Sequence, residues 1–368
     1  MAAATSAAAA DATDGYGEAL LQCPDLCLEA LRQAQLAYNA SEVPAADGGF
    51  PGWEFTTSMA EQALPNAEEP PTLRVVGRVR IGAERDEPFT AVVEVSFRGT
   101  KNLDNWRTNL MGSHLQALSL GSGHGQVHGG WQEAYLALRG VMLANINEGL
   151  SQLGDPDDEN VLALVTGHSL GGALATLAAY DLAVFRRFTV RCVTWASPRV
   201  GDADFAAEYC SKVPMTARYV NKLDVVPRLP MNPSDENDDG AIIGAWLRKA
   251  LHTILQKPRE MCGLHGYCHV CKGIVLDKDV DHGRDLRASA ASFFSGRGFW
   301  KVVVGFHSLE RYRMYLERVT LGGELPPPID VNATALDEGQ NSSASSEGVS
   351  QNEIEVWIRG SALDDSTE

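Results

Sequence analysis

One serine of this chain has neighbours that suit nucleophilic chemistry. Ser169 lies between Gly167 and Gly171 in the run LVTGHSLGGALATLAAY, after an apolar stretch and before an alanine-rich one. This G-x-S-x-G pattern is typical of a sharp strand-to-helix turn that exposes the serine hydroxyl at a helix N-terminus. His168 belongs to the same turn and not to a catalytic triad. The alternative is an ordinary serine at the start of a glycine-rich helix, and the residues elsewhere in the chain must decide.

A nucleophilic serine needs a base, and an acid that orients the base. Asp224 follows the β-rich run ARYVN in a turn closed by Pro227, whereas Asp202 lies in a looser loop. Asp202 could equally cap the helical pattern that follows it. The sequence therefore favours Asp224 as the acid.

The base is less well defined, because five histidines follow Asp224. His307 comes after the last expected strand and immediately before a helical pattern, where a loop could bring it to Ser169. Any single histidine can also be a surface residue or a satisfied core residue. The five candidates are His252, His265, His269, His282 and His307.

Alternating strand-like and helical patterns predict the elements that would position these residues. Helical spacing is expected at 17–39, 131–153 and 170–185. The strand-like runs are 73–81, 90–97, 161–166, 190–196, 217–221 and 273–277. Strands that alternate with helices predict an α/β fold, with a mostly parallel sheet covered by helices on both faces.

Length and charge limit the possible organisation and partners. With 368 residues, the chain can form one large domain of roughly 250–300 residues plus extensions. The formal net charge of −17 argues against non-specific binding to nucleic acid. No run approaches the ~20 apolar residues of a membrane span. Seven cysteines spread thinly over this length do not suggest a disulfide framework.

The two ends differ in composition from the middle. We expect residues 1–15 to be disordered, residues 16–320 to form the domain with an insertion at about 231–300, and residues 321–368 to form an acidic, disordered tail. The N-terminus lacks the basic and leucine-rich regions of a secretory signal, so we expect an intracellular, cytoplasmic protein. Its Ala/Ser/Thr bias keeps plastid targeting as an alternative.

Several blocks, in order, resemble the class 3 lipases, the fungal-type triacylglycerol lipase family of α/β-hydrolases. The resemblance runs from about residue 36 to residue 316. Its blocks are VSFRGT (95–100), NW (105–106), VHGGWQEAY (127–135), VTGHSLGGALA (165–175), WASPRVGDADFA (195–206), RYVNKLDVVPRLP (218–230), GYCHVCKGIVLD (266–277) and HSLERY (307–312). The resemblance implies an α/β-hydrolase fold.

Carried over block by block, the resemblance also implies a role for each site residue. Ser169 would be the nucleophile, Asp224 the orienting acid and His307 the general base. Thr100 and the backbone N–H of Leu170 would form the oxyanion hole. These roles give hydrolysis of a lipid ester at a droplet or membrane surface through an acyl-enzyme, with no cofactor or metal.

Two alternatives to an acylglycerol lipase stay open. One is another acyl hydrolase on the same scaffold, such as a phospholipase A1 or a galactolipase, because the triad does not distinguish between these substrates. The other is a lipase-like interaction protein that keeps the fold without the chemistry. The presence of Ser169, Asp224 and His307 together favours an enzyme.

Two further segments could carry function. Residues 241–257 form a basic amphipathic pattern that could lie on a membrane surface or pack against the protein's own core. Cys262, Cys268 and Cys271, with histidines among them, suggest a zinc cluster. Their C-x₅-C-x₂-C spacing is not that of a standard finger, and the resemblance instead makes this segment the lead into a strand. We therefore expect no metal.

Residues 101–111 are a lid candidate, because they directly follow the expected oxyanion strand, where fungal members carry their lid. Leu103, Trp106 and Leu110 fall at i, i+3 and i+7, on one face of a short helix. The alternative is an ordinary amphipathic helix packed on the core.

The lid interpretation predicts a substrate-dependent effect of Trp106→Ala. Removing the indole should reduce hydrolysis of emulsified esters more than hydrolysis of soluble esters, because only the emulsion offers an interface to an open lid. Initial rates on the two substrate forms would be compared at equal enzyme concentration. An equal loss on both forms would contradict the lid.

Overall fold

The computed structural model describes residues 15–39, 51–58, 72–99, 115–120, 124–230, 266–280 and 305–324. Several predictions fall outside these ranges. They are Thr100, the lid candidate at 101–111, the helix at 241–257, Cys262, and most of both terminal segments. These predictions, and the domain boundaries, stay predictions.

A seven-stranded sheet forms the centre of the described residues. Its strands are β1 (Trp53–Ser58), β2 (Thr72–Ile81), β3 (Ala91–Phe97), β6 (Val161–His168), β7 (Thr189–Trp195), β8 (Met215–Val220) and β9 (Gly273–Val275). They lie in space in the order β1-β2-β3-β6-β7-β8-β9. The pairs β1–β2 and β2–β3 are antiparallel, and all pairs from β3 to β9 are parallel. The predicted mostly parallel sheet is confirmed.

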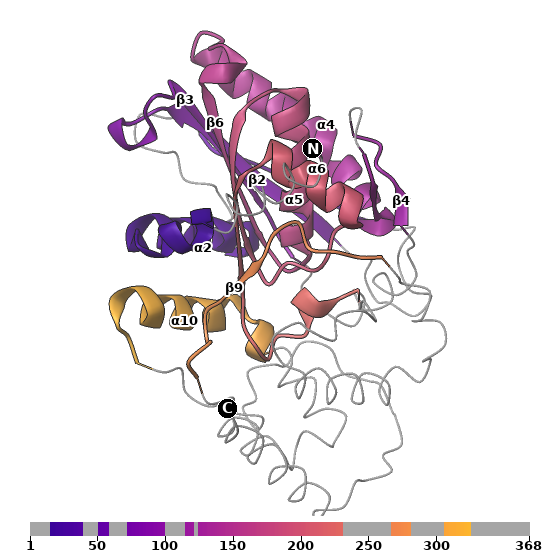
Figure 1. Ribbon diagram of the computed structural model, residues 1–368. Coiled ribbons are helices and arrows are strands. Elements are labelled where there is room, and N and C mark those ends of the chain that lie inside the picture. Colours follow the sequence, from indigo (N-terminus) through magenta and orange to yellow (C-terminus); the bar gives the residue numbers. More distant parts are fainter. Residues whose placement is uncertain are drawn as a thin grey trace, which may run out of the picture.

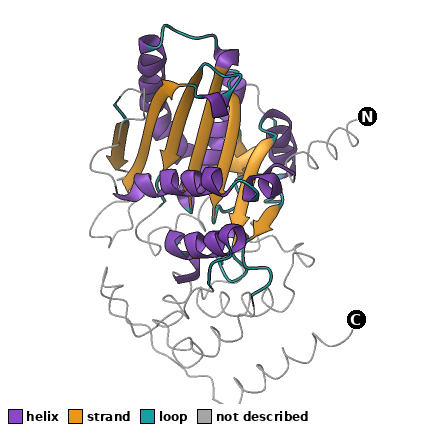
Figure 2. Cartoon of the chain, turned by 90° about the vertical axis from the view of Figure 1, so that its left-hand side faces the viewer, coloured by secondary structure: helices purple, strands orange, loops and turns teal. Residues whose placement is uncertain are grey.

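Helices cover both faces of this sheet, as predicted (Figures 1 and 2). One face carries α4 (Gly129–Gln152) and α5 (Leu170–Phe185), and the other carries α2 (Pro24–Asn39) and α10 (Leu309–Leu321). Successive side chains of β7 point to opposite faces of the sheet and so pack into both cores. Cys192 packs into the core under α4 and α5, while Val193 and Trp195 pack into the core under α2 and α10.

Smaller elements connect the sheet and its helices. A separate antiparallel pair is formed by β4 (Leu115–Ala117) and β5 (Gln126–His128), and α6 (Ala203–Lys212) follows β7. Asp202 is the N-cap of α6, where its carboxylate accepts the Phe205 N–H at 2.8 Å. His128 likewise caps α4 and accepts the Trp131 N–H. The capping alternative for Asp202 is therefore confirmed, and Asp202 is occupied in a structural role.

The N-terminal helical segment differs from the prediction of one helix over 17–39. Residues 15–21 are helical, the helix is interrupted at Gln22 and Cys23, and α2 begins at Pro24. Proline lacks an N–H and clashes with the preceding turn inside a helix, but it is well tolerated in the first turn. The leucine spacing continues across this break, which is why the periodicity alone suggested one helix.

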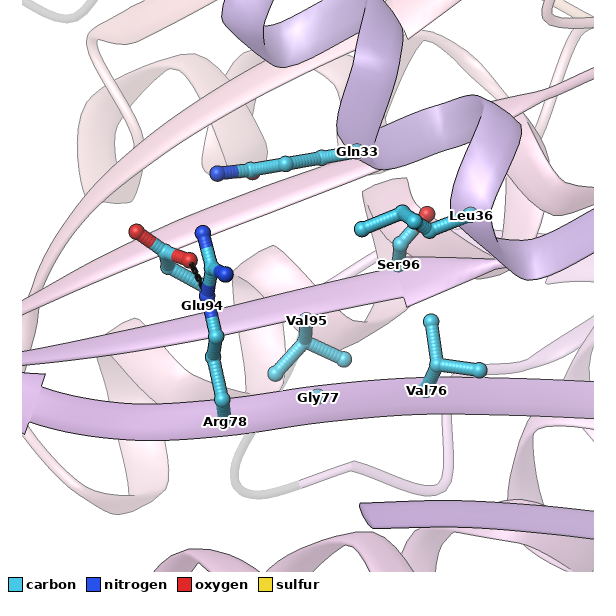
Figure 3. Close-up of a pocket in the computed structure, with 8 residues that line it drawn as sticks. All are labelled: Gln33, Leu36, Val76, Gly77, Arg78, Glu94, Val95 and Ser96. Atoms are coloured by element: carbon cyan, nitrogen blue, oxygen red, sulfur yellow. Dashed lines mark hydrogen bonds and ion pairs between the residues drawn. The ribbon is translucent and has the colours of Figure 1, made fainter. Parts of the chain in front are cut away.

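A hollow lies between α2 and strands β2 and β3 (Figure 3). Gln33 and Leu36 face it from α2, and the ion pair between Arg78 and Glu94 faces it from the strands. Its lining contains none of the predicted catalytic residues. Among the described helices, none is both long enough and apolar enough to span a membrane.

The packing of α4 on the sheet predicts unequal effects for two leucines of that helix. Leu138 is fully buried in the core, whereas Leu136 is 42% exposed. Leu138→Ala should lower the free energy of unfolding by about 2–5 kcal/mol through lost burial and a cavity. Leu136→Ala should lower it by less than about 1 kcal/mol. Urea denaturation of both variants measures the difference, and equal losses would contradict this orientation of α4.

Candidate active site

The carboxyl ends of the parallel strands meet at one edge of the sheet, and the predicted site residues follow these ends. In the ladders, Phe97 of β3 lies opposite Gly167 of β6, and His168 of β6 lies opposite Trp195 of β7. Asp224 follows the end of β8. Ligands and reacting groups in open α/β sheets gather at this edge, outside the carboxyl ends of the strands.

Ser169 has the strained backbone expected of a nucleophile elbow. It joins β6 to α5 with φ 61° and ψ −130°, a conformation that residues with side chains rarely adopt. Its N–H donates to the Trp195 carbonyl at 2.9 Å, and its carbonyl accepts the Gly172 N–H at 2.8 Å. Its Oγ does not cap α5 and has no hydrogen-bond partner among the described residues. The backbone is thus tied on both sides, while the hydroxyl is left for other partners.

The two motif glycines are required by backbone contacts. A Cβ on Gly167 would lie 2.1 Å from the Gly171 carbonyl oxygen, and a Cβ on Gly171 would lie 2.1 Å from the Phe97 carbonyl oxygen. Gly99 is equally confined, since a Cβ there would lie 2.9 Å from the Ser169 Cβ. The last described residue before Thr100 therefore lies directly against the serine.

Asp224 is a buried carboxylate whose two oxygens are both hydrogen-bonded. Its Oδ1 accepts the Val226 N–H at 2.9 Å, and its Oδ2 accepts the Tyr312 hydroxyl at 2.8 Å. His307 Nδ1 lies 2.9 Å from Oδ2 and 3.1 Å from Oδ1. These donors offset the loss of water around a carboxylate that is 1% exposed.

His307 is oriented by this carboxylate. Because a carboxylate accepts hydrogen bonds, Nδ1 carries the proton in the neutral ring, and Nε2 keeps a free lone pair. Nε2 is buried and has no partner among the described side chains and backbone. The ring packs against His168, the residue before Ser169, with 4.6 Å between centroids and 33° between the ring planes. An imidazole with this tautomer can act as a general base for a serine that its Nε2 reaches.

The structure thus brings Ser169, Asp224 and His307 to one edge of the sheet. Leu170 is the first residue of α5, where helix N–H groups have no intrahelical partner, so its amide can serve an oxyanion. Thr100 lies just outside the described residues.

Sequence reasoning gave no role to two residues that hold Asp224 and His307 in place. Tyr312 on α10 donates to Asp224 and accepts the Asn221 N–H at 3.1 Å. Asn221 Nδ2 in turn donates to the carbonyl of Phe306, next to His307. Burial and the neighbouring Asp224 hold the pKa of Tyr312 well above its usual range, so it stays a hydroxyl donor. Tyr312 is in the HSLERY block, but no pattern in the nearby sequence indicates that it would donate to Asp224, 88 residues away.

The cysteine and histidine segment is only partly described. His269 Nε2 lies 2.7 Å from the Pro227 carbonyl, in the turn after Asp224, and burial holds its pKa well below its usual range. This histidine therefore serves the Asp224 loop as a neutral donor. No group of three metal-ligating side chains occurs within the described ranges, which include Cys268 and Cys271 but omit Cys262.

A family model matches the middle of the chain. Residues 94–233 match the model described as Lipase (class 3), so over this segment the chain is similar to the class 3 lipases. The matched residues run from β3 through the elbow to the Asp224 loop. Of the predicted site residues that the structure describes, only His307 lies outside them.

Curated relatives include a protein named as a phospholipase A1 and one named as a mono- and diacylglycerol lipase. The chain is 37% identical over 153 residues to Phospholipase A1-Igamma2, chloroplastic, of Arabidopsis thaliana, covering 39% of this chain and 26% of the relative. It is 38% identical over 143 residues to Secreted mono- and diacylglycerol lipase 1 of Fusarium solani, covering 38% and 39%. The chain thus spans about a quarter to two fifths of these relatives' lengths.

Solved structures show a more distant likeness. A mutant form of MDLA from Penicillium cyclopium is 19% identical, with a TM-score of 0.41, covering 67% of this chain and 75% of that one. The Rhizomucor miehei lipase propeptide complex is 23% identical, with a TM-score of 0.38, covering 55% and 60%.

The elbow contacts predict opposite effects for two glycine-to-alanine changes in helices. Gly171→Ala should destabilise the protein by about 1–3 kcal/mol, because the new methyl group meets the Phe97 carbonyl. The methyl group added by Gly140→Ala in α4 has no neighbouring atom within 4 Å, so this change should stabilise the protein by about 0.5–1 kcal/mol. Thermal unfolding distinguishes the two, and a stable Gly171→Ala variant would contradict the close approach of β3 and α5.

Proposed function

We propose that this chain is a class 3 lipase that hydrolyses carboxylic ester bonds of lipids through a serine acyl-enzyme. The observation that carries the proposal is the buried Asp224–His307 pair, whose imidazole packs against His168, the residue before the elbow serine. His307 Nε2 and Ser169 Oγ are both buried and have no hydrogen-bond partner among the described residues. A structural serine or histidine in a core is normally hydrogen-bonded, so these two orphaned groups favour a reactive pair.

In the proposed mechanism, His307 Nε2 takes the proton of the Ser169 hydroxyl as its oxygen attacks the ester carbonyl. Asp224 holds the Nδ1–H tautomer and stabilises the imidazolium that forms. The oxyanion accepts hydrogen bonds from the Leu170 amide and, we infer, from Thr100. His307 then gives its proton to the departing alcohol, and an activated water releases the fatty acid from Ser169.

The substrate class within lipid esters is a second proposal. Relatives named as phospholipases A1 and relatives named as mono- and diacylglycerol lipases both match this chain. We propose acylglycerols as substrates, with phospholipids as the alternative to be tested beside them.

Contact with a lipid surface through residues 241–257 is part of the same proposal. The pattern of that segment supports it, because the basic face suits anionic head groups and the apolar face suits acyl chains. Intracellular location is likewise proposed from the sequence, while several of the relatives are named as chloroplastic.

The proposal predicts that Ser169→Ala abolishes ester hydrolysis, with a loss of at least about 10³-fold. Asp224→Asn should lose about 10³–10⁴-fold, because the amide no longer favours the correct tautomer of His307. Rates would be measured on tributyrin below and above its solubility limit, on a long-chain triacylglycerol and on a phospholipid dispersion.

Ser197→Ala is the matched control for Ser169→Ala. Ser197 is also a buried serine near the elbow, but its hydroxyl donates to the Pro198 carbonyl. This variant should keep wild-type rates within about threefold. A wild-type protein that is inert on all substrates, or a Ser169→Ala variant that equals it, would leave the interaction-protein alternative.

A further inference from the structure

Three hydrogen bonds link the end of β3 to the backbone of the proposed base. The Gly99 N–H donates to the Tyr38 hydroxyl oxygen at 3.1 Å. That oxygen lies 2.8 Å from His168 Nδ1, and His168 Nε2 lies 2.7 Å from the His307 carbonyl oxygen. Tyr38 is in the last turn of α2, so the chain of bonds joins four segments that are distant in sequence.

The proton positions in this chain follow from the chemistry of its ends. A carbonyl only accepts, so His168 Nε2 must carry a hydrogen and donate to His307. In the neutral ring Nδ1 then accepts, and its donor is the Tyr38 hydroxyl. The Tyr38 oxygen keeps a lone pair for the Gly99 N–H. Every donor thus has one acceptor, and with a neutral His168 ring only this placement of the protons satisfies all three hydrogen bonds.

The same arrangement keeps His168 neutral. Burial and the neighbouring His307 hold the pKa of His168 well below its usual range. Burial also raises the pKa of Tyr38, which therefore remains a hydroxyl donor. A neutral ring at this place matters, because His168 packs against His307, the ring that becomes positive in the proposed mechanism.

We propose that Tyr38 and His168 are positioning residues of the ester hydrolysis proposed above. They hold the carboxyl end of β3, which leads to the expected oxyanion donor, at a fixed position relative to His307. The inference rests on that proposed function. Gly99 precedes the expected oxyanion donor Thr100 and lies against Ser169, so a displaced Gly99 moves the oxyanion hole relative to the base. An active site loses about 10²-fold when such groups are misplaced by about 1 Å.

The first test is Tyr38→Phe, which removes one oxygen and leaves the Gly99 N–H and His168 Nδ1 without their partner. On tributyrin below its solubility limit, kcat should fall about 10- to 100-fold while KM stays within about twofold. Tyr209→Phe is the matched control. This variant also removes a hydrogen-bonded hydroxyl, which lies 3.0 Å from Thr216 Oγ1. Thr216 is at the N-terminal end of β8, whereas Asp224 follows the C-terminal end, so kcat should stay at the wild-type value.

A purely structural role for Tyr38 predicts a different result. Tyr38→Phe would then lower the melting temperature as Tyr209→Phe does, and kcat per folded molecule would equal that of the wild type. That outcome would overturn the proposal.

The second test asks whether Tyr38 and His168 act as one unit. His168→Gln can still donate to the His307 carbonyl, but it lacks the ring acceptor that Tyr38 uses. The Tyr38→Phe/His168→Gln double variant should therefore keep a kcat within about threefold of His168→Gln alone. Multiplied losses in the double variant would show two independent sites and contradict the linked chain.

A third measurement does not depend on activity. Imidazole ¹⁵N NMR of the wild-type protein should show His168 as the neutral Nε2–H tautomer from pH 5 to pH 8, with the signal assigned by its loss in His168→Gln. An Nδ1–H tautomer, or an imidazolium at pH 6, would overturn the proposal. If the wild type hydrolyses no ester, the proposed function fails, while this spectrum still tests the chain of bonds.

Discussion

The close backbone contact between the end of β3 and the first turn of α5 is the constraint on which the rest of the site depends. Gly171 lies against the Phe97 carbonyl, and Gly167 lies against the Gly171 carbonyl, so neither position has room for a side chain. This contact forces the tight turn at Ser169, whose φ of 61° is maintained by the ladders on both sides. Strain of this kind persists only where the surrounding structure over-determines the backbone.

The electrostatics of the site centre on the buried carboxylate of Asp224. Asp224 is surrounded by donors from the Val226 amide, the Tyr312 hydroxyl and the His307 ring. His168 and the two tyrosines keep their neutral forms, because burial disfavours their charged forms. A positive His307 would therefore have the Asp224 carboxylate as its hydrogen-bonded partner, while the adjoining His168 ring stays neutral. That arrangement suits a base whose charge changes during the reaction.

The sequence predicted those parts of the structure that depend on local patterns. Strand and helix periodicity predicted the α/β layers, and the elbow is visible in the motif because its glycines are adjacent in sequence. Asp224 could be preferred to Asp202 from their strand and loop contexts. His307 could not be chosen from five histidines without the family resemblance, because its link to Asp224 spans 83 residues. Tyr38 and Tyr312 were missed for the same reason. Strand β1 was missed because it is a half-exposed edge strand, whose pattern is weak.

The distribution of the site along the chain has a consequence for its biosynthesis. Tyr38 and His168 are 130 residues apart, and His168 and His307 are a further 139 apart. Domains fold as the chain emerges, beginning from the N-terminal part. A nascent chain that has released the elbow but not residue 307 holds Ser169 without the proposed base, and α2 without α10 beside it. The proposed site can therefore assemble only when the ribosome has released nearly all of the described residues, and a translation product that stops before residue 307 lacks the proposed base.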